Sequence, residues 1–394
     1  MSAAFPRLWQ EIATIGRDST GGYLRYALSE PELVLRDWFR NQAARRDLPV
    51  TEDGNGNLFA WWGTPWGHRA VITGSHFDSV PHGGGYDGPL GIVSAFLAVD
   101  ALRKRGFEPG RPLGIAAFVE EEGGRFGVPC LGSRLLTGAI SPDKAAALRD
   151  RDGITFGEAL GVRPAGALPD LAGRVSAVVE LHIEQGRALV ELDAPVGVAS
   201  AIWPHGRWRM DFTGSGDHAG TTRMADRRDP MLTYAATVLA ANEEAREAGA
   251  HATVARVEVT PNATNAIPSL VRGWLDARAA DTATLDRLVE AVVKRATERA
   301  GQDGTELAVE PESVSPEVTF DTGLAARLAG TLGGAPILPT QAGHDAGVLS
   351  AHVPTAMLFV RNPTGISHSP AEHAPDEDCA AGVEALATVL EALL

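Results

Sequence analysis

The sequence predicts an α/β protein in which a smaller α+β domain interrupts the chain of a larger α/β domain. Three observations lead to this prediction. Apolar, strand-like runs alternate with an apolar helical segment between residues 57 and 119. From about residue 205 the pattern changes to two long amphipathic segments set among alternating strands. After residue 319 the first pattern returns. We therefore expect one domain formed by residues 1–204 and 320–394, and an inserted domain formed by residues 205–319.

The amino-terminal half of the chain reads as helices followed by alternating strands and helices. Near its start, Leu8, Ile12 and Ile15 recur at helical spacing. Helices are expected at 5–18, 31–48 and 90–105, strands at 57–62, 70–73, 113–119 and 175–183, and helical and loop segments at 141–174. Strands that alternate with helices in this way predict a parallel sheet, and such sheets bind ligands at the carboxyl ends of their strands.

The inserted domain should consist of strands beside a pair of helices. Its second helix carries Leu285, Leu288 and Val292 on one face. Strands are expected at 207–213, 252–260 and 269–278, and helices at 228–248 and 283–300. After the insertion, the α/β texture resumes with an apolar segment at 324–332, a strand at 355–360 and a last helix at 376–394. Together these segments predict an α+β sandwich inside an α/β domain.

Length and charge limit the functions that the chain can have. At 394 residues it is too long for one ordinary core, and 44% hydrophobic with 22% charged residues is typical of a folded protein. The formal charge of -15 and the pI of about 5.2 argue against nucleic acid or an anionic membrane as the main partner. A small molecule is the ligand that we expect.

The cysteine content and the amino-terminal segment further limit the kinds of site and the location that the protein can have. The chain has only two cysteines, Cys130 and Cys379, so neither a disulfide framework nor a thiolate zinc site is available. A metal would have to be held by histidine and carboxylate. The first ten residues lack the basic and apolar regions of a signal peptide, and the chain has no apolar run of about 18 residues. We therefore expect a cytoplasmic protein.

The stretch Gly74–Gly91 concentrates residues that bind metals. Its sequence GSHFDSVPHGGGYDGPLG follows the apolar run at 70–73. His76 and Asp78 point to the same side of an extended segment, and a glycine-rich loop lets Asp87 return to face them. This pattern indicates a metal site, although a polar turn with incidental histidines is the alternative. On the residues alone, His82 is as good a ligand as His76.

Further candidate ligands follow the other predicted strands. Glu121 and Glu122 come after the strand at 113–119, His182 lies in the strand at 175–183, and His368 follows the strand at 355–360. Imidazole and carboxylate ligands suit Zn²⁺, Mn²⁺, Co²⁺ or Ni²⁺. A solvated acidic turn is the alternative for the two glutamates. A lone histidine in a strand such as His182 is more often a satisfied core residue.

Several motifs in this order resemble a known family. The motifs are GSHFDSVPHGGGYDG, EEGGRFG, LHIEQG, GSGDHAGTT, NATNAIPS, GHDA and GISHSPAEH. They are similar to those of the M20 metallopeptidase-like amidohydrolases, in the branch of carbamoylases, β-ureidopropionases and allantoate amidohydrolases, and the resemblance covers nearly the whole chain. It implies a dinuclear-metal α/β catalytic domain of the M20 peptidase type, with an inserted α+β domain that acts as a lid and forms a homodimer.

The resemblance also implies roles for the candidate ligands. It implies two divalent metal ions bridged by Asp87, Zn²⁺ or otherwise Mn²⁺, Co²⁺ or Ni²⁺. Of the remaining metal ligands, one ion takes the pair His76 and His182, and the other takes the pair Glu122 and His368. Among the catalytic residues, Asp78 would orient a ligating imidazole and Glu121 would be the general base. His82 has no place in the family pattern.

Substrate contacts are implied mainly for the inserted domain. His218 would donate a hydrogen bond to the developing oxyanion, and Asn265 and Arg278 would bind the substrate carboxylate. In the larger domain, Gln185 would contact the ureido group and the backbone at Gly343 would contact the substrate. A surface ion pair with Asp276 is the alternative for Arg278. Whether the residues of the inserted domain act in their own chain or in a partner's site stays open.

The motif around His182 bears on the reaction. In this superfamily, peptidases and aminoacylases typically have a carboxylate at this ligand position, whereas the ureido-hydrolysing branch has the HxEQG pattern found at residues 182–186. The resemblance therefore implies hydrolysis of the carbamoyl or ureido C–N bond of an N-carbamoyl-L-amino acid or a related ureido acid, with release of ammonia and CO2.

Other activities stay open at this point. Allantoate hydrolysis is the first alternative, since Arg361–Gly365 and Thr222–Met224 are reminiscent of allantoate amidohydrolases. An M20 aminoacylase or dipeptidase is the next. A metal-retaining binding protein without turnover is the third, and the presence of Glu121 beside a full ligand set argues against it.

Overall fold

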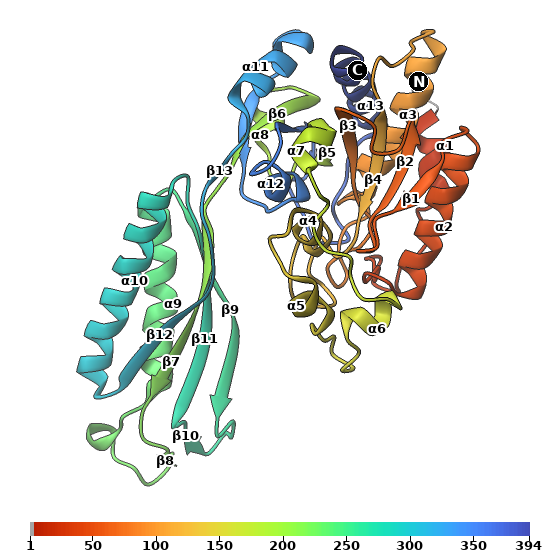
Figure 1. Ribbon diagram of the computed structural model, residues 1–394. Coiled ribbons are helices and arrows are strands. Elements are labelled where there is room, and N and C mark those ends of the chain that lie inside the picture. The colour runs from red at the N-terminus through yellow and green to blue at the C-terminus, as the bar shows by residue number, and fades with distance from the viewer. Residues whose placement is uncertain (1–3) are drawn as a thin grey trace. The chain divides into compact units, whose positions relative to one another are not determined.

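The computed structural model describes residues 4–394, which fold as two compact units. Unit 1 runs up to Ile202 and resumes from Thr319 to Leu394, whereas unit 2 is the continuous segment Trp203–Val318 (Figure 1). The boundaries expected from the sequence, after residues 204 and 319, lie within two residues of these breaks. Within residues 4–394, no helix has the length and apolarity needed to cross a membrane.

Unit 1 is built on one mixed sheet in the order β1-β2-β4-β3-β5-β15-β6-β13, with β14 beside β6. Its strands are β1 (Val50–Glu52), β2 (Leu58–Trp62), β3 (Ala70–His76), β4 (Leu113–Phe118), β5 (Val175–Ile183), β6 (Val196–Ile202), β13 (Val318–Thr319), β14 (Ile337–Thr340) and β15 (Thr355–Val360). The central strands β4, β3, β5 and β15 are parallel. Strand β2 pairs antiparallel with β4, and β6 antiparallel with β15. The expected parallel sheet therefore forms the centre, where both faces are covered, and β14 adds a further parallel pair with β6.

Helices cover both faces of this sheet. They are α1 (Ala4–Gln10), α2 (Glu30–Ala44), α3 (Pro89–Lys104), α4 (Leu131–Thr137), α5 (Pro142–Ala146), α6 (Phe156–Leu160), α7 (Leu171–Arg174), α8 (Ala188–Glu191), α11 (Thr322–Thr331), α12 (Asp345–Leu349) and α13 (Asp376–Leu393). Val71 and Val179 pack with α1, α2, α3, α11 and α13 in one core cluster. Their strand neighbours Ile72 and Val178 face α4 and α12 in another. This alternation is the period of two of a strand that is buried on both faces.

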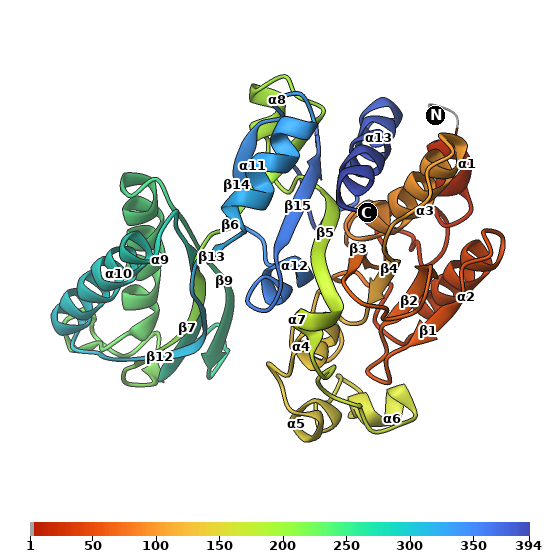
Figure 2. The same cartoon turned by 45° about the horizontal axis from the view of Figure 1, so that its top comes forward.

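The carboxyl ends of the central strands bring the candidate site together. Strands β15, β5 and β3 lie side by side, and β4 follows beyond β3 (Figure 2). They end at Val360, Ile183, His76 and Phe118. Because parallel strands end at one edge of the sheet, the loops that follow them converge there.

Unit 2 is an antiparallel sheet in the order β12-β7-β11-β9, packed against a helix pair (Figure 1). Its elements are β7 (His205–Thr213), β8 (Asp217–His218), the short 3₁₀ helix η1 (Met224–Asp226), α9 (Pro230–Glu247), β9 (His251–Thr260), β10 (Ala266–Ile267), β11 (Leu270–Arg278), α10 (Thr282–Asp303) and β12 (Glu306–Ser315). Met210 and Leu275 from the sheet pack with Leu288 and Val292 of α10 in the core.

Strand β12 was not expected from the sequence. It is mostly exposed, its sequence ELAVEPESVS is rich in glutamate, and it contains Pro311. The register between β12 and β7 shifts between Pro311 and Ser313. A proline at such an irregularity of an edge strand is compatible with pairing, because its missing N–H is not required there. Alternation of apolar residues is limited to the first half of the strand, where Leu307 and Val309 pack against the core of unit 2.

Candidate metal centre and active site

His76 and His182 present matching nitrogens to Asp87. His76 Nδ1 lies 3.0 Å from the carbonyl oxygen of Asp78, and His182 Nδ1 lies 2.9 Å from that of Ile183. A carbonyl only accepts, so each Nδ1 donates, and in the neutral form each ring has its lone pair on Nε2. Both Nε2 atoms are buried and have no hydrogen-bond partner among residues 4–394. They lie 3.5 and 3.2 Å from Asp87 Oδ1, an arrangement that fits a cation.

The other oxygen of Asp87 belongs to a second group of ligands. His368 Nε2 lies 3.4 Å from Asp87 Oδ2 and 3.4 Å from Glu122 Oε2. Asp87 thus belongs to two clusters of candidate ligands at once, one with His76 and His182 and one with Glu122 and His368. A carboxylate with one oxygen toward each cluster can bridge two cations.

The loop before α3 places Asp87 close to His76. The next residue, Gly88, has φ of 86°, a conformation that side chains disfavour. A Cβ at this position would lie 2.5 Å from Cε1 of His76. Glycine is therefore required on both grounds for the carboxylate of Asp87 to approach the imidazole.

The electrostatics of the cluster also favour cations. Burial and the charge of Asp87 raise the pKa of Glu122 to about 7. Burial lowers the pKa of His368, but the hydrogen bond to Asp87 and the charge of Glu122 outweigh it and raise this pKa to about 9. Buried carboxylates thus outnumber the positive charges that could balance them, and protons take the place that metal ions would fill.

Asp78 acts on its neighbours through both main chain and side chain. Its carboxylate accepts hydrogen bonds from the backbone N–H groups of Glu121 and Glu122, each at 3.1 Å. The carboxylate Oδ1 lies 3.6 Å from His76 Nδ1, farther than the carbonyl oxygen at 3.0 Å. The family pattern implies that the carboxylate of Asp78 orients a ligating imidazole. In the structure, the carbonyl oxygen of Asp78 makes the closer contact and therefore mainly orients the ring of His76. The carboxylate instead anchors the turn that carries the two glutamates.

Glu121 is buried beside the ligand cluster. Its Oε2 lies 3.6 Å from His76 Nε2, and its Oε1 lies 3.7 Å from the Sγ of Cys130. Burial raises the pKa of Glu121 well above its usual range, and the nearby charge of His76 acts in the opposite direction. A carboxyl group in this environment holds a proton readily, as a general base in hydrolysis must.

Glu372 supports the site but was not singled out from the sequence. Its Oε1 accepts hydrogen bonds from the backbone N–H groups of Tyr86 and Asp87, each at 2.9 Å. Burial and the charge of Asp87 raise the pKa of Glu372 to about 8. The available signal was its place in the motif GISHSPAEH, where attention fell on His368. Ser367 in the same motif lies 3.3 Å from Asp87 Oδ2.

Gln185 extends the site toward a ligand. Its Nε2 donates to Asp87 Oδ2 at 2.8 Å and to Ser367 Oγ at 3.1 Å. Its Oε1 is buried and has no hydrogen-bond partner in the described chain. A buried acceptor without a donor is costly, so this oxygen points to a ligand that supplies an N–H or O–H group.

His218 and Asn265 are neighbours in unit 2. Strand β8 pairs with β10 so that His218 faces Ala266, and the N–H of Ala219 donates to the carbonyl of Asn265 at 3.0 Å. The ring Nδ1 of His218 accepts from the backbone N–H of Gly220 at 2.9 Å. The proton of the neutral ring is therefore on Nε2, which is free to donate to a ligand.

Arg278 lies far from this pair within the same unit. Asn265 precedes β11 and Arg278 ends it, and the eight residue steps of the strand span roughly 27 Å at about 3.4 Å each. The guanidinium of Arg278 also donates to Asp276 at 3.0 Å, the ion pair weighed as its alternative role.

Two further candidates lie apart from these groups. Gly343 precedes α12 in a loop of unit 1, with open space where a side chain would be. His82 is exposed and pairs with Asp18, outside the candidate ligand clusters.

The chain is similar to known proteins over nearly its whole length. The model of the peptidase family M20/M25/M40 matches residues 72–392. The chain is 36% identical to an N-carbamoyl-L-amino acid amidohydrolase of Geobacillus stearothermophilus over 96% of both chains. It is 32% identical to the allantoate amidohydrolase of Escherichia coli, covering 96% of this chain and 95% of the relative. The crystal structure of an amidase of the hydantoinase/carbamoylase family from Burkholderia multivorans matches with a TM-score of 0.87 and 32% identity, over 99% of this chain and 97% of that one.

Proposed function

This chain belongs to the peptidase family M20/M25/M40, and on that premise we propose that it hydrolyses the carbamoyl or ureido C–N bond of an N-carbamoyl-L-amino acid or a related ureido acid. Ammonia and CO2 would be released. The observation that carries the proposal is the pair of ligand clusters that share Asp87 beside the buried Glu121. Relatives with this chain's full length are named for such substrates, one as an N-carbamoyl-L-amino acid amidohydrolase and another as an allantoate amidohydrolase.

Two divalent metal ions per chain fit the donor set. His76 and His182 with Asp87 would hold one, and Glu122 and His368 with Asp87 the other. Imidazole and carboxylate ligands favour Zn²⁺, with Mn²⁺, Co²⁺ and Ni²⁺ as alternatives. When bound, such a pair of cations polarises a carbonyl oxygen and lowers the pKa of water.

The protein groups handle the proton. Glu121 takes a proton from the attacking water on a carboxylate oxygen and delivers it to the departing nitrogen. Its burial and raised pKa favour the uptake of the proton. Asp78 keeps Glu121 in place through the hydrogen bond that it accepts from the Glu121 backbone at 3.1 Å.

Hydrogen-bonding groups of the candidate residues recognise the substrate. The buried Oε1 of Gln185 accepts an N–H of the terminal ureido amide, a group that a dipeptide lacks at the scissile carbonyl. The backbone at Gly343 adds a further contact. The Nε2 of His218 donates to the oxyanion, while Asn265 and Arg278 bind the substrate carboxylate.

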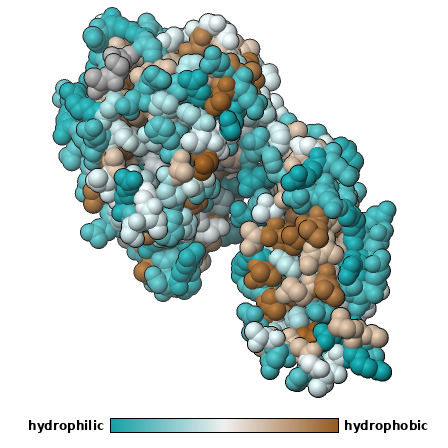
Figure 3. All heavy atoms as spheres, turned by 180° about the vertical axis from the view of Figure 1, so that it is seen from behind, coloured by the Kyte–Doolittle hydropathy of each residue, from teal (hydrophilic) through white to brown (hydrophobic). Residues whose placement is uncertain are grey.

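The separation of Asn265 from Arg278 supports a homodimer formed through unit 2. A ureido acid is too short to touch both ends of β11 in one chain, so each active site of a dimer takes Asn265 from one chain and Arg278 from the other. Helix α9 exposes Leu232 and Leu239, which are 47% and 66% exposed and lie two helical turns apart on one face. Figure 3 shows apolar side chains gathered on one face of unit 2. Strand β9 is an edge of its sheet and offers unpaired backbone groups for a second copy.

The cytoplasmic location stays a prediction.

Ammonia release separates the proposed function from its alternatives. We would assay N-carbamoyl-L-amino acids, N-carbamoyl-β-alanine and allantoate, with a dipeptide and an N-acetyl amino acid as controls. Turnover of ureido acids without cleavage of the controls is the expected result. A preference for allantoate alone would favour an allantoate amidohydrolase. Cleavage of the dipeptide or the N-acetyl compound, with no ammonia from any ureido compound, would refute the proposal in favour of a dipeptidase or aminoacylase.

A further inference from the structure

A cavity of about 180 Å³ adjoins the candidate metal centre within unit 1. It lies between the turn after β5, the first turn of α8, the turn after β14, and β15. Side chains that line it include those of Glu184, Gln185, Arg187, Glu191, Gln341 and Phe359. Gln185 connects the cavity to the site, because its Nε2 donates to Asp87 Oδ2 at 2.8 Å. A substrate bound beside Asp87 can therefore extend a side chain into the cavity.

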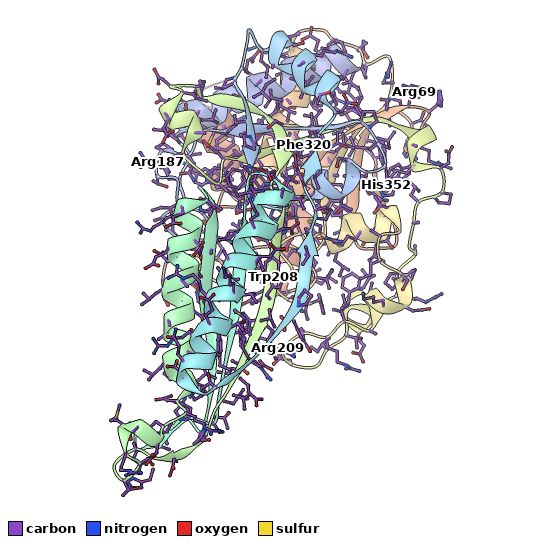
Figure 4. All side chains as sticks on the ribbon, turned by 90° about the vertical axis from the view of Figure 1, so that its left-hand side faces the viewer. Arg69, Arg187, Trp208, Arg209, Phe320 and His352 are labelled. Atoms are coloured by element: carbon purple, nitrogen blue, oxygen red, sulfur yellow. The ribbon has the colours of Figure 1, made fainter. Side chains whose placement is uncertain are left out.

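Arg187 is the cationic side chain among the residues that line the cavity. Its side chain is labelled in Figure 4. Its aliphatic stem packs against Gly365, since a Cβ at that position would lie 2.1 Å from Arg187 Cγ and 2.6 Å from Cδ. Gly365 also has φ of 65°, so both contact and conformation disfavour a side chain there. The loop that contains Gly365 carries Ser367 and His368. The stem of Arg187 is thereby held next to the loop that completes the metal centre.

The guanidinium of Arg187 has no ion pair with any residue in the part of the chain that the structure describes. In contrast, Arg361 at the start of the same loop pairs with Asp378 at 2.9 Å and with Asp193 at 3.3 Å. The chain carries a formal charge of -15, so carboxylates are abundant around its arginines. Arg187 is nevertheless left without one at the wall of a cavity beside the reaction centre, where it is available to an anion from outside the chain.

We propose that Arg187 binds a carboxylate on the substrate's side chain, so that the preferred ureido acid is a diacid of the N-carbamoyl-aspartate or N-carbamoyl-glutamate type. This inference rests on the proposed function and narrows its substrate class. The planar guanidinium binds a carboxylate through parallel hydrogen bonds, which a neutral side chain cannot match. The cavity volume corresponds to roughly six water molecules at about 30 Å³ each, which is enough for a short acidic side chain.

Glu191 provides an internal check on this assignment. It lines the same cavity and lies one helical turn after Arg187, but it forms no ion pair with it among the described residues. Its carboxylate repels a substrate anion that Arg187 attracts. Substitution of Glu191 should therefore shift selectivity in the direction opposite to substitution of Arg187.

The test compares two substrates that differ only in side-chain charge. We would measure kcat/KM of ammonia release from N-carbamoyl-L-aspartate and N-carbamoyl-L-asparagine. The wild-type enzyme should prefer the diacid, and Arg187→Gln should reduce the ratio of the two kcat/KM values on the order of tenfold to a hundredfold. Arg187→Lys should restore part of the ratio, and Glu191→Gln should raise it. Arg163→Gln is the matched control, because Arg163 is an exposed arginine that pairs with Asp143 outside the cavity.

Different outcomes separate this inference from the proposed function. An unchanged ratio of the two kcat/KM values in Arg187→Gln overturns the inference. An equal loss of kcat/KM on both substrates also overturns it, because Arg187 would then contact a group that both substrates share or would have a structural role. Turnover of neutral ureido acids without preference for the diacid in the wild type also overturns it and leaves the proposed function standing. Absence of ammonia from every ureido acid overturns both. Should Arg187→Gln fail to fold, the ratios measured for Arg187→Lys and Glu191→Gln decide.

Discussion

The carboxylate of Asp78 accepts a hydrogen bond from the backbone N–H of Glu121 at 3.1 Å. Its other oxygen accepts from the N–H of Glu122 at the same distance. One carboxylate therefore sets the position of the proposed general base and of a proposed metal ligand. The turn that follows β4 depends on this contact, because consecutive N–H groups there point at a single acceptor.

Asp78→Asn should impair both catalysis and metal retention. The amide that replaces one carboxylate oxygen is a donor and would face a backbone N–H, so one of the two anchors is lost. We expect kcat to fall about tenfold to a hundredfold, with weaker metal binding, as is typical when a residue that orients ligands is changed. Steady-state kinetics and elemental analysis on the same preparation would check this. Asp18→Asn is the control, because Asp18 pairs with the exposed His82. Normal kcat in Asp78→Asn would contradict the positioning role.

Glu121→Gln should separate chemistry from metal binding. Glutamine keeps the size of the side chain but cannot take up the proton, so kcat should fall about a hundredfold to ten-thousandfold while metal content stays at the wild-type value. Glu122→Gln, one residue along, should instead lose metal. If Glu121→Gln turns over normally, Glu121 is not the base.

Metal content should report the shared position of Asp87. The wild-type protein should bind two transition-metal ions per chain at saturation, measured by elemental analysis after equilibration with Zn²⁺ or Mn²⁺. Asp87→Ala should weaken the binding of both ions, whereas His182→Ala should weaken mainly the binding of one. A single ion in the saturated wild-type protein would exclude the bridged arrangement.

The metal-free protein should lose stability as pH rises. In the folded state Glu122 has a pKa of about 7 and Glu372 a pKa of about 8, against an ordinary value of 4.5, and His368 has a pKa of about 9 against 6.5. Each pKa is raised, so between pH 4.5 and pH 9 the folded state holds protons that the unfolded state has released. The free energy of unfolding therefore decreases with pH in this window.

Melting temperatures with chelator and with added metal, across the same pH range, would test this. Metal ions replace the protons, so the gap between the loaded and metal-free protein should widen as pH rises. Glu122→Gln should flatten the slope of the metal-free protein, because it removes one of the titrating groups. Parallel curves for the two forms would show that these groups do not govern the stability.

Mixed dimers should reveal which chain supplies His218 and Arg278. His218→Ala and Arg278→Ala should each be poorly active alone. When the two variants are mixed and their subunits exchange, half of the dimers are hybrids. Each hybrid has one complete active site, so about a quarter of wild-type activity should return. No recovery despite confirmed subunit exchange would show that each active site takes both residues from the same chain. Leu239→Glu should favour monomers in light scattering and prevent the recovery.

Local patterns were sufficient for much of the architecture. The fold class and family follow from strand-like runs, helical periodicity and short motifs, and the comparisons confirm them. The apolar runs that became β3, β4, β5 and β15 were readable because strands buried on both faces are continuously apolar. Strand β12 was missed because it is exposed and contains Pro311, so pairing with β7 decides its conformation.

The sequence by itself determined which residue types are available to bind metals. Without a cysteine pair, only histidine and carboxylate remain, and both His76 and Asp87 lie within one short motif. Tertiary structure alone decided how distant groups meet. Glu372 reaches the N–H of Asp87 across 285 positions, and the stem of Arg187 packs against Gly365. The division follows from physics: periodicity and motif spacing are properties of neighbouring residues, whereas contacts between distant segments depend on strand register and packing, which no local pattern records.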